Sequence, residues 1–149
     1  MYTRLLTFIA VLAIAGACKS ESKPIIYGED KCEFCRMSIV DQQFGCEVVT
    51  KKGKVFKFDA VECMVNYLDQ KQLDESAYAM ILTNAYDAPG KLIDATACNY
   101  LQSENMPSPM GMFLNPFENS DEAIKYQKQE TGTIYDWQEL RIAMASNDK

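Results

Sequence analysis

The chain has 149 residues, of which 21 are acidic and 15 are basic, so its formal net charge is −6 at neutral pH. A chain this acidic lacks the clustered lysine and arginine that neutralise phosphates, which argues against a nucleic-acid partner. It has no histidine but six cysteines. A soft-metal site in this chain would therefore have to be built from cysteine and methionine sulfur.

The N-terminal residues have the pattern of an export signal. A short apolar segment, 5–14, follows the single positive side chain of Arg4 and is too short to span a bilayer. Small residues then lead directly into Cys18, as in bacterial lipoprotein processing sites. We therefore predict that residues 1–17 are a signal peptide and that Cys18 carries a lipid. An ordinary signal peptide cut near Ala17 is the alternative, and both place the domain outside the cytoplasm.

With the acyl anchor, the protein is expected at the periplasmic face of a bacterial membrane. Residues 18–24 are polar and lack apolar periodicity, so we predict a lipidated N-terminus and flexible tether there and one compact domain at 25–149. Once Cys18 is assigned to lipid, an odd number of cysteines remains. These cannot all pair within one chain, so at least one thiol must be free or bound to a ligand.

The first part of the domain predicts two strands followed by a helix. Segments 44–50 and 54–58 are rich in β-branched and aromatic residues, and Lys51-Lys52-Gly53 between them predicts a hairpin turn. Asp59 and Glu62 have the spacing of a capping box. A helix is expected from there, because apolar residues recur at 61, 64, 65 and 68.

The middle of the chain predicts a buried strand at 78–83, because the segment is almost continuously apolar and of strand length. By composition, residues 84–90 are expected to form a loop and residues 91–94 a short strand. The segment 95–102 is expected to form one or two helical turns.

The last part repeats the order of strand and capped helix. It predicts a short strand at 113–114, a break at Asn115-Pro116 and a helix from Ser120 to Gly132. A strand at 134–135 follows, and then a final helix that begins with a capping box of Asp136 and Glu139. The predicted class is α+β with small, mostly antiparallel sheets and packed helices.

The stretch Cys32-x-x-Cys35-x-Met37 places three soft sulfur donors within six residues. Thiolate and thioether ligands favour Cu(I). Short apolar segments at 25–27 and 38–40 suggest that strand-like pieces flank the motif. In an extended segment, residues two apart point the same way, so Cys35 and Met37 can chelate one ion with Cys32 close enough to assist.

A second sulfur-rich run lies at residues 106–112 and contains three methionines. Prolines at 107 and 109 exclude an ordinary helix, so these methionines cannot form a buried helical stripe. A methionine in a loop is more often exposed than functional. Met110, beside Gly111, is nevertheless placed where a thioether can reach a neighbouring site and complete it if the two runs meet.

Other interpretations of the cysteines remain open at this point. A zinc site of four thiolates would have to recruit Cys46, Cys63 or Cys98, none of which lies in a second C-x-x-C pair. These three most simply act as small buried hydrophobic residues, although a disulfide between Cys63 and Cys98 is also open. Cys32 and Cys35 could instead form a structural disulfide.

The rival function in a different class is a membrane-tethered thiol-disulfide oxidoreductase that uses Cys32 and Cys35. A thioredoxin-like dithiol needs a strand before the motif and a long helix that begins at it, and the segment that follows is too short for such a helix. The chain also lacks a serine in a nucleophile elbow and a phosphate-binding glycine loop. Nothing in the sequence therefore argues for an enzyme.

Taken together, these motifs resemble the nitrous oxide reductase accessory protein family, NosL. The resemblance covers nearly the whole mature chain in order, and it rests on the C-x-x-C-x-M motif after a lipoprotein signal, Phe58-Asp59-Ala60-Val61-Glu62-Cys63-Met64, Asp94-Ala95, Met110-Gly111, and the later Phe117, Ala123, Gly132 and Trp137.

The resemblance implies an exported, membrane-anchored Cu(I) metallochaperone that supplies apo nitrous oxide reductase, with handover at a membrane transporter complex. It implies a fold of two similar ββα-type units and copper ligands at Cys35, Met37 and Met110. The family usually has glycine where this chain has Arg36. A cation at that position can lower the pKa of the Cys35 thiol.

Overall fold

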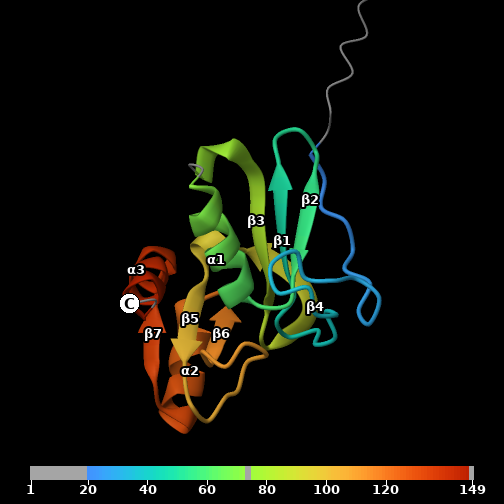
Figure 1. The fold of residues 1–149 in the computed structure, drawn as a ribbon. Helices are drawn as coiled ribbons and strands as arrows, with labels where there is room; N and C mark the ends of the chain where they lie inside the picture. Colours follow the sequence, from blue (N-terminus) through green and yellow to red (C-terminus); the bar gives the residue numbers. More distant parts are fainter. Residues whose placement is uncertain (1–19, 73–74, 148–149) are drawn as a thin grey trace, which may run out of the picture.

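The structure contains two antiparallel sheets, and the three strands of the second repeat the order of three strands of the first (Figure 1). The structure is a computed structural model that describes residues 20–72 and 75–147, so the predicted signal peptide and Cys18 lie outside the described residues. The elements are β1 (Cys46–Thr50), β2 (Val55–Phe58), α1 (Val61–Lys71), β3 (Tyr78–Ala85), β4 (Ala88–Asp94), β5 (Asn99–Gln102), β6 (Leu114–Phe117), α2 (Ser120–Glu130), β7 (Thr133–Tyr135) and α3 (Trp137–Asn147).

The first sheet has the order β2-β1-β3-β4, and the second has the order β6-β5-β7. Each therefore begins with a hairpin, continues through a helix and adds a third strand beside the first strand of the hairpin. This confirms the α+β class and the two similar ββα-type units, and it extends the repeat by one strand. None of the helices in the described ranges has the length and apolarity needed to cross a bilayer.

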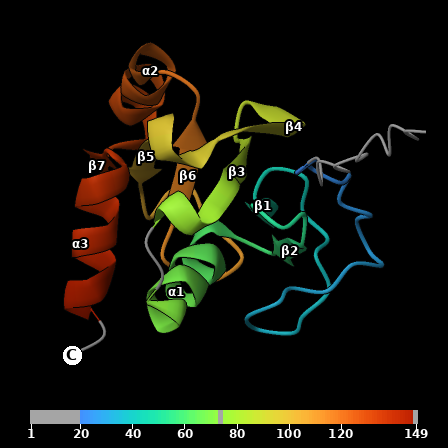
Figure 2. The same ribbon diagram turned by 90° about the horizontal axis from the view of Figure 1, so that it is seen from above.

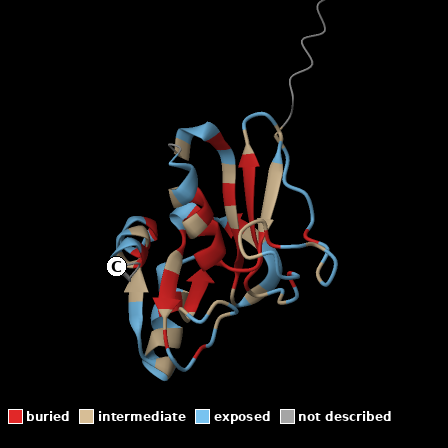
Figure 3. Cartoon of the chain, in the orientation of Figure 1, coloured by how far each residue is buried: buried red, intermediate tan, exposed pale blue. Residues whose placement is uncertain are grey.

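The predicted first hairpin is confirmed. Cys46 pairs with Phe58 and Val49 with Val55, and Gly53 takes a positive φ of 79° in the turn between the strands. Apolar residues of α1 are buried between the two sheets, as Figure 3 shows by the concentration of buried residues there. The hairpin therefore delivers the chain directly to the buried N-terminal end of α1.

The predicted capping box at this helix is wrong. The N-cap is Ala60, and no side chain caps the helix. Glu62 is only 2% exposed and its carboxylate accepts a hydrogen bond from Ser108 instead. By contrast, the capping box of α3 is confirmed, because Asp136 and Glu139 each accept a backbone N–H of the other, at 2.8 and 3.0 Å.

Two predictions in the middle of the chain are also wrong. The expected loop 84–90 is mostly strand, since β3 continues to Ala85 and β4 begins at Ala88. The expected helical turns at 95–102 are one 3-10 turn, Ala95–Ala97, followed by β5. Tyr100 and Leu101 are both fully buried, because this central strand is covered on both faces, and such a strand has no alternation to distinguish it from a helical turn.

The expected break at Asn115-Pro116 is instead part of β6. Proline is tolerated there because β6 is an edge strand of its sheet. The carbonyl of Pro116 accepts the backbone N–H of Tyr86 at 2.8 Å, which ties the second sheet to the end of β3.

The residues before β1 form loops and not the strand-like pieces expected at 25–27 and 38–40. A single bridge joins Lys31 to Ser38, and the backbone N–H of Gly28 donates to Ile39 at 2.7 Å. Figure 2 shows this N-terminal segment on the side of the first sheet away from α2 and α3. Part of the predicted tether is held against the sheet, because the backbone N–H of Lys23 donates to the buried carboxylate of Glu47 at 2.8 Å.

Candidate metal centre

Three cysteine sulfurs meet where the N-terminal segment touches the first turn of α1. The Sγ atoms of Cys32, Cys35 and Cys63, called here the cysteine cluster, all lie within 4.8 Å of one another. Cys32 and Cys63 are fully buried, and Cys35 is partly exposed. The sequence interpretation of Cys63 as a simple hydrophobic residue missed this contact. No spacing pattern signals it, because the hairpin β1–β2 separates the two segments.

The cysteine loop, residues 32–37, is closed by its own backbone. The N–H of Cys32 donates to the carbonyl of Met37 at 2.8 Å, and the N–H of Arg36 donates to the carbonyl of Cys32 at 3.1 Å. Arg36 has a φ of 66°, in the left-handed region that costs a residue with a side chain about 1–2 kcal/mol. The loop thus keeps a backbone conformation suited to glycine even though the residue is arginine.

The pKa values of the Cys32 and Cys63 thiols are shifted in opposite directions. A hydrogen bond from Cys63 lowers the pKa of Cys32 to about 5 despite burial, and backbone groups of Asp59, Cys35 and Phe34 add to this effect. The same contact raises the pKa of Cys63. This hydrogen bond therefore favours the thiolate form on Cys32 and the thiol form on Cys63, which donates the bond.

The expected effect of Arg36 on Cys35 is not found. Burial raises the pKa of the Cys35 thiol, and the backbone N–H of Met37 only partly offsets this. The Arg36 side chain is 70% exposed and pairs with Glu33 at 3.3 Å. Its charge is therefore directed to solvent and a neighbouring carboxylate.

All five cysteines in the described part of the chain are free, so neither the Cys32–Cys35 nor the Cys63–Cys98 disulfide is formed. The Cys46 and Cys98 thiols lie outside the cluster and donate to backbone carbonyls at 3.2 and 3.1 Å. A four-thiolate zinc site is therefore not assembled from the described residues. The oxidoreductase interpretation is not favoured either, because no helix begins at the cysteine loop.

The methionine loop, residues 106–112, is tied to the same end of α1. The Ser108 hydroxyl donates to Glu62 Oε1 at 2.6 Å and accepts the backbone N–H of Phe113 at 2.9 Å. Glu62 precedes Cys63 in the chain, so this bond holds the methionine loop beside the helix turn that carries the cluster. Met110 and Cys35 are partly buried against the same core.

The structure places the three methionines of the loop differently. Met106 is 4% exposed and belongs to the core of the second sheet, whereas Met110 and Met112 pack against the main core. Met37, in the cysteine loop, is 49% exposed. The assignment of Met37 and Met110 as ligands stays a prediction, as does assistance from Cys32.

The family profile of NosL matches residues 25–145, which include the cysteine loop, Cys63 and the methionine loop. The chain belongs to the NosL family. The fold is similar to the crystal structure of the copper chaperone NosL from Shewanella denitrificans, with a TM-score of 0.68 at 18% identity over 81% of this chain and 96% of that chain. No curated protein matches the sequence.

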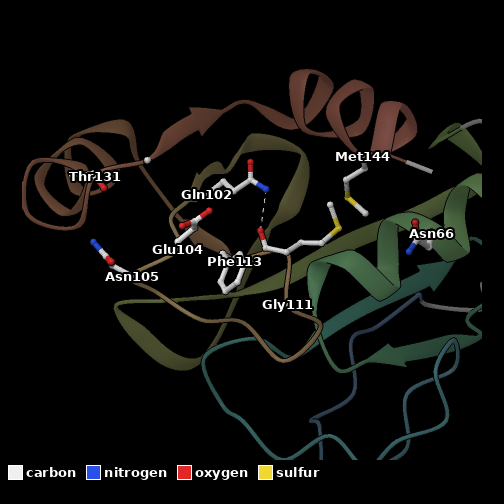
Figure 4. A pocket seen from close by; sticks show the side chains of 10 residues that line it. Asn66, Gln102, Glu104, Asn105, Gly111, Phe113, Thr131 and Met144 are labelled. Carbon is white, nitrogen blue, oxygen red and sulfur yellow. Dashed lines mark hydrogen bonds between the residues drawn. The ribbon is translucent and has the colours of Figure 1, made fainter. Parts of the chain in front are cut away.

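A cavity of about 760 Å³ in this NosL protein lies behind the methionine loop (Figure 4). The cavity is lined by Gly111 and Met112 of the loop, by Phe113 beside the loop, and by Met144 of α3. The Gln102 side chain reaches from β5 and donates to the backbone carbonyl of Met112 at 3.0 Å. Solvent-accessible space therefore lies beside the end of the methionine loop at Gly111 and Met112.

Glu62 links this loop to the cluster and is expected to make stability depend on pH. Burial raises its pKa, although the Ser108 hydroxyl opposes this change, and its Oε2 atom has no hydrogen-bond partner. A folded-state pKa above the unfolded value means that this stabilising contribution is complete below the unfolded pKa and is lost as pH rises through the folded pKa. A tenfold change in a protonation equilibrium between the folded and unfolded states corresponds to about 1.4 kcal/mol.

Glu62→Gln is therefore expected to unfold at a higher temperature than the wild type at pH 8, because glutamine cannot ionise and can still accept from Ser108. The difference should shrink as pH falls through the folded-state pKa of Glu62, because the carboxyl group then takes up a proton. Thermal unfolding at several pH values measures this. The matched change at the exposed Glu104 should leave the curve unchanged. A Glu62→Gln protein less stable than wild type at pH 8 would contradict the prediction.

Proposed function

We propose that this NosL protein is a Cu(I) carrier and not an enzyme, and that it delivers copper to apo nitrous oxide reductase during maturation of its copper centres. The observation that carries the proposal is the cysteine cluster, with three sulfurs within 4.8 Å beside a methionine loop fixed to the same helix. The structurally similar protein from Shewanella denitrificans is described as a copper chaperone, which supports the same cargo.

The chemistry of the donors favours Cu(I) over harder ions. Thiolates and thioethers are soft ligands, whereas magnesium, calcium and manganese prefer oxygen. The nearest carboxylates, on Asp59 and Glu62, are buried, and burial raises their pKa values, which disfavours the charged form that hard cations prefer. Sulfur therefore dominates the donor set.

Cys35, Met37 and Met110 are the proposed ligands for delivery, with Cys32 as an assisting donor. Cys35 is partly exposed and Met37 is 49% exposed, so a metal held between them can be reached by an acceptor. The apolar side chains of Ile26 and Val40, 53% and 66% exposed, lie on the same N-terminal segment. They offer an apolar edge against which an acceptor can dock while it exchanges ligands one at a time.

We further propose that the protein is exported and anchored at the periplasmic face of a bacterial membrane by a lipid on Cys18. Tethering would keep the carrier close to a membrane transporter complex that supplies or receives the copper. Attachment would depend on that N-terminal lipid.

Met37→Leu and Met110→Leu are each expected to weaken Cu(I) binding by about tenfold or more, equivalent to about 1.4 kcal/mol. Leucine preserves the volume of the side chain but removes the thioether. Anaerobic titration against a competing Cu(I) chelator measures the affinity. Met106→Leu is the matched control, since this buried methionine of the same loop belongs to the second core. Unchanged affinity in both test variants would rule out the proposed delivery ligands.

A further inference from the structure

We infer that Cys32, Cys35 and Cys63 form a second, inner site for a soft monovalent or divalent cation, and that copper rests there between uptake and delivery. The inner site shares Cys35 with the delivery ligands Met37 and Met110. The identity of the cargo rests on the proposed function, but the existence of the three-thiolate site does not.

The spacing of the sulfurs suits a single metal ion. With metal–sulfur bonds of about 2.3 Å, three sulfurs around one ion in a plane lie about 4.0 Å apart. The three Sγ atoms of the metal-free cluster lie within 4.8 Å of one another, so a contraction of less than about 1 Å closes the site. Side-chain rotation can supply a movement of this size without displacing α1.

The inner site is enclosed on the protein side. Cys32 and Cys63 are 0% exposed, and Cys35 is the only partly exposed member of the cluster. A cation bound by all three is therefore covered by its own ligands, whereas a cation held by Cys35 and Met37 faces solvent. This difference separates a protected resting position from an accessible delivery position.

The surroundings of the cluster also favour a cation. Asp59 and Glu62 are buried beside it, and Asp59 Oδ1 and Glu62 Oε2 have no hydrogen-bond partner. Two cations on the neighbouring segments are already paired with other carboxylates, since Lys57 binds Asp30 and Arg36 binds Glu33. A metal cation would therefore supply positive charge where unpaired acceptors are buried.

Movement between the two sites requires only ligand exchange. The bonds from the metal to Cys32 and Cys63 break while bonds to Met37 and Met110 form, and the bond to Cys35 persists. Cu(I) keeps its oxidation state. Each released cysteine sulfur keeps its electron pair and returns, by proton exchange with solvent, to the protonation state that it has in the metal-free cluster, so the step needs no oxidant or reductant.

Cd(II) is the probe that counts thiolates, because it gives sulfur-to-metal charge-transfer absorption with thiolates and binds thioethers weakly. The full-length chain carrying Cys18→Ser is the common background, so that the thiol of Cys18 does not contribute. Cys32→Ala and Cys63→Ala are each expected to lower the absorption per bound Cd(II) by about one third, because each removes one of three thiolates. Cys46→Ala and Cys98→Ala, also buried, are expected to leave it unchanged.

Full absorption in both Cys32→Ala and Cys63→Ala would overturn the inner site. Using two variants on different elements, one in the cysteine loop and one in α1, keeps the test decisive if one of them fails to fold. The same samples loaded with Cu(I) should release copper to a chelator faster by about tenfold or more when Cys63 is replaced. If Met37→Leu and Met110→Leu bind Cu(I) normally while the Cd(II) result holds, the delivery ligands fail and the inner site stands.

Discussion

Cys35→Ser is expected to weaken Cu(I) binding by about a hundredfold or more, which corresponds to about 2.8 kcal/mol or more. The reason is that Cys35 is a full ligand in both sets, whereas Cys32 only assists in the delivery set. Without Cys35, the inner set keeps Cys32 and Cys63, and the delivery set keeps two thioethers and the assisting Cys32. Loss of Met37 or Cys63 removes one donor from one set and should have a smaller effect. Anaerobic chelator competition measures all of these affinities on the same scale.

The fold should tolerate this substitution, which makes the result specific to the metal. Cys35 is partly exposed, and a serine there can accept the backbone N–H of Met37 that faces the thiol. The free energy of unfolding should change by about 0.5 kcal/mol or less. Cys98→Ser controls for removal of a thiol elsewhere. Affinity within tenfold of wild type in Cys35→Ser would mean that the copper is held by other residues.

Local patterns predict this fold only where no distant residue competes for the same atoms. In two places an Asp-x-x-Glu sequence opens a predicted helix and suggests a capping box. At Asp136 and Glu139 the helix end is exposed, and both reciprocal bonds form. At Asp59 and Glu62 the helix end is buried, and Ser108, which lies 46 residues away, binds Glu62 instead. The sequence holds the same signal twice, and tertiary packing decides between the outcomes.

The candidate site shows the same division. The C-x-x-C-x-M motif is local and visible in the sequence, and the methionine run is loop and not helix, as its prolines predict. Cys63 carries no such signal, because its approach to Cys32 depends on how the intervening hairpin folds back. Arg36 shows the opposite case. Its φ of 66° is a backbone conformation that glycine favours, and an arginine in the sequence does not predict that conformation.

Gly132→Ala is expected to destabilise the protein by about 2–5 kcal/mol, because it combines backbone strain with overpacking. Gly132 has a φ of 111°, and a Cβ there would lie 2.1 Å from the backbone oxygen of Gln102 and 3.1 Å from Ser103 Cβ. The clash involves backbone of β5, so rotation of a side chain cannot relieve it. The sequence indicated this glycine only as the end of a helix, because its neighbour comes from another strand.

Gly132→Ala should also have a small effect on the metal site. Gln102 holds the carbonyl of Met112, so displacement of β5 loosens the methionine loop and should reduce Cu(I) affinity less than Cys35→Ser does.

Gly28→Ala is the matched control, because Gly28 also has a positive φ, 87°, but no atom lies within 4 Å of the added Cβ. It should lose only about 1 kcal/mol from strain. Equal losses of stability in both variants, by thermal or denaturant unfolding, would mean that the close approach of Gly132 to β5 contributes nothing and that backbone conformation alone selects glycine there.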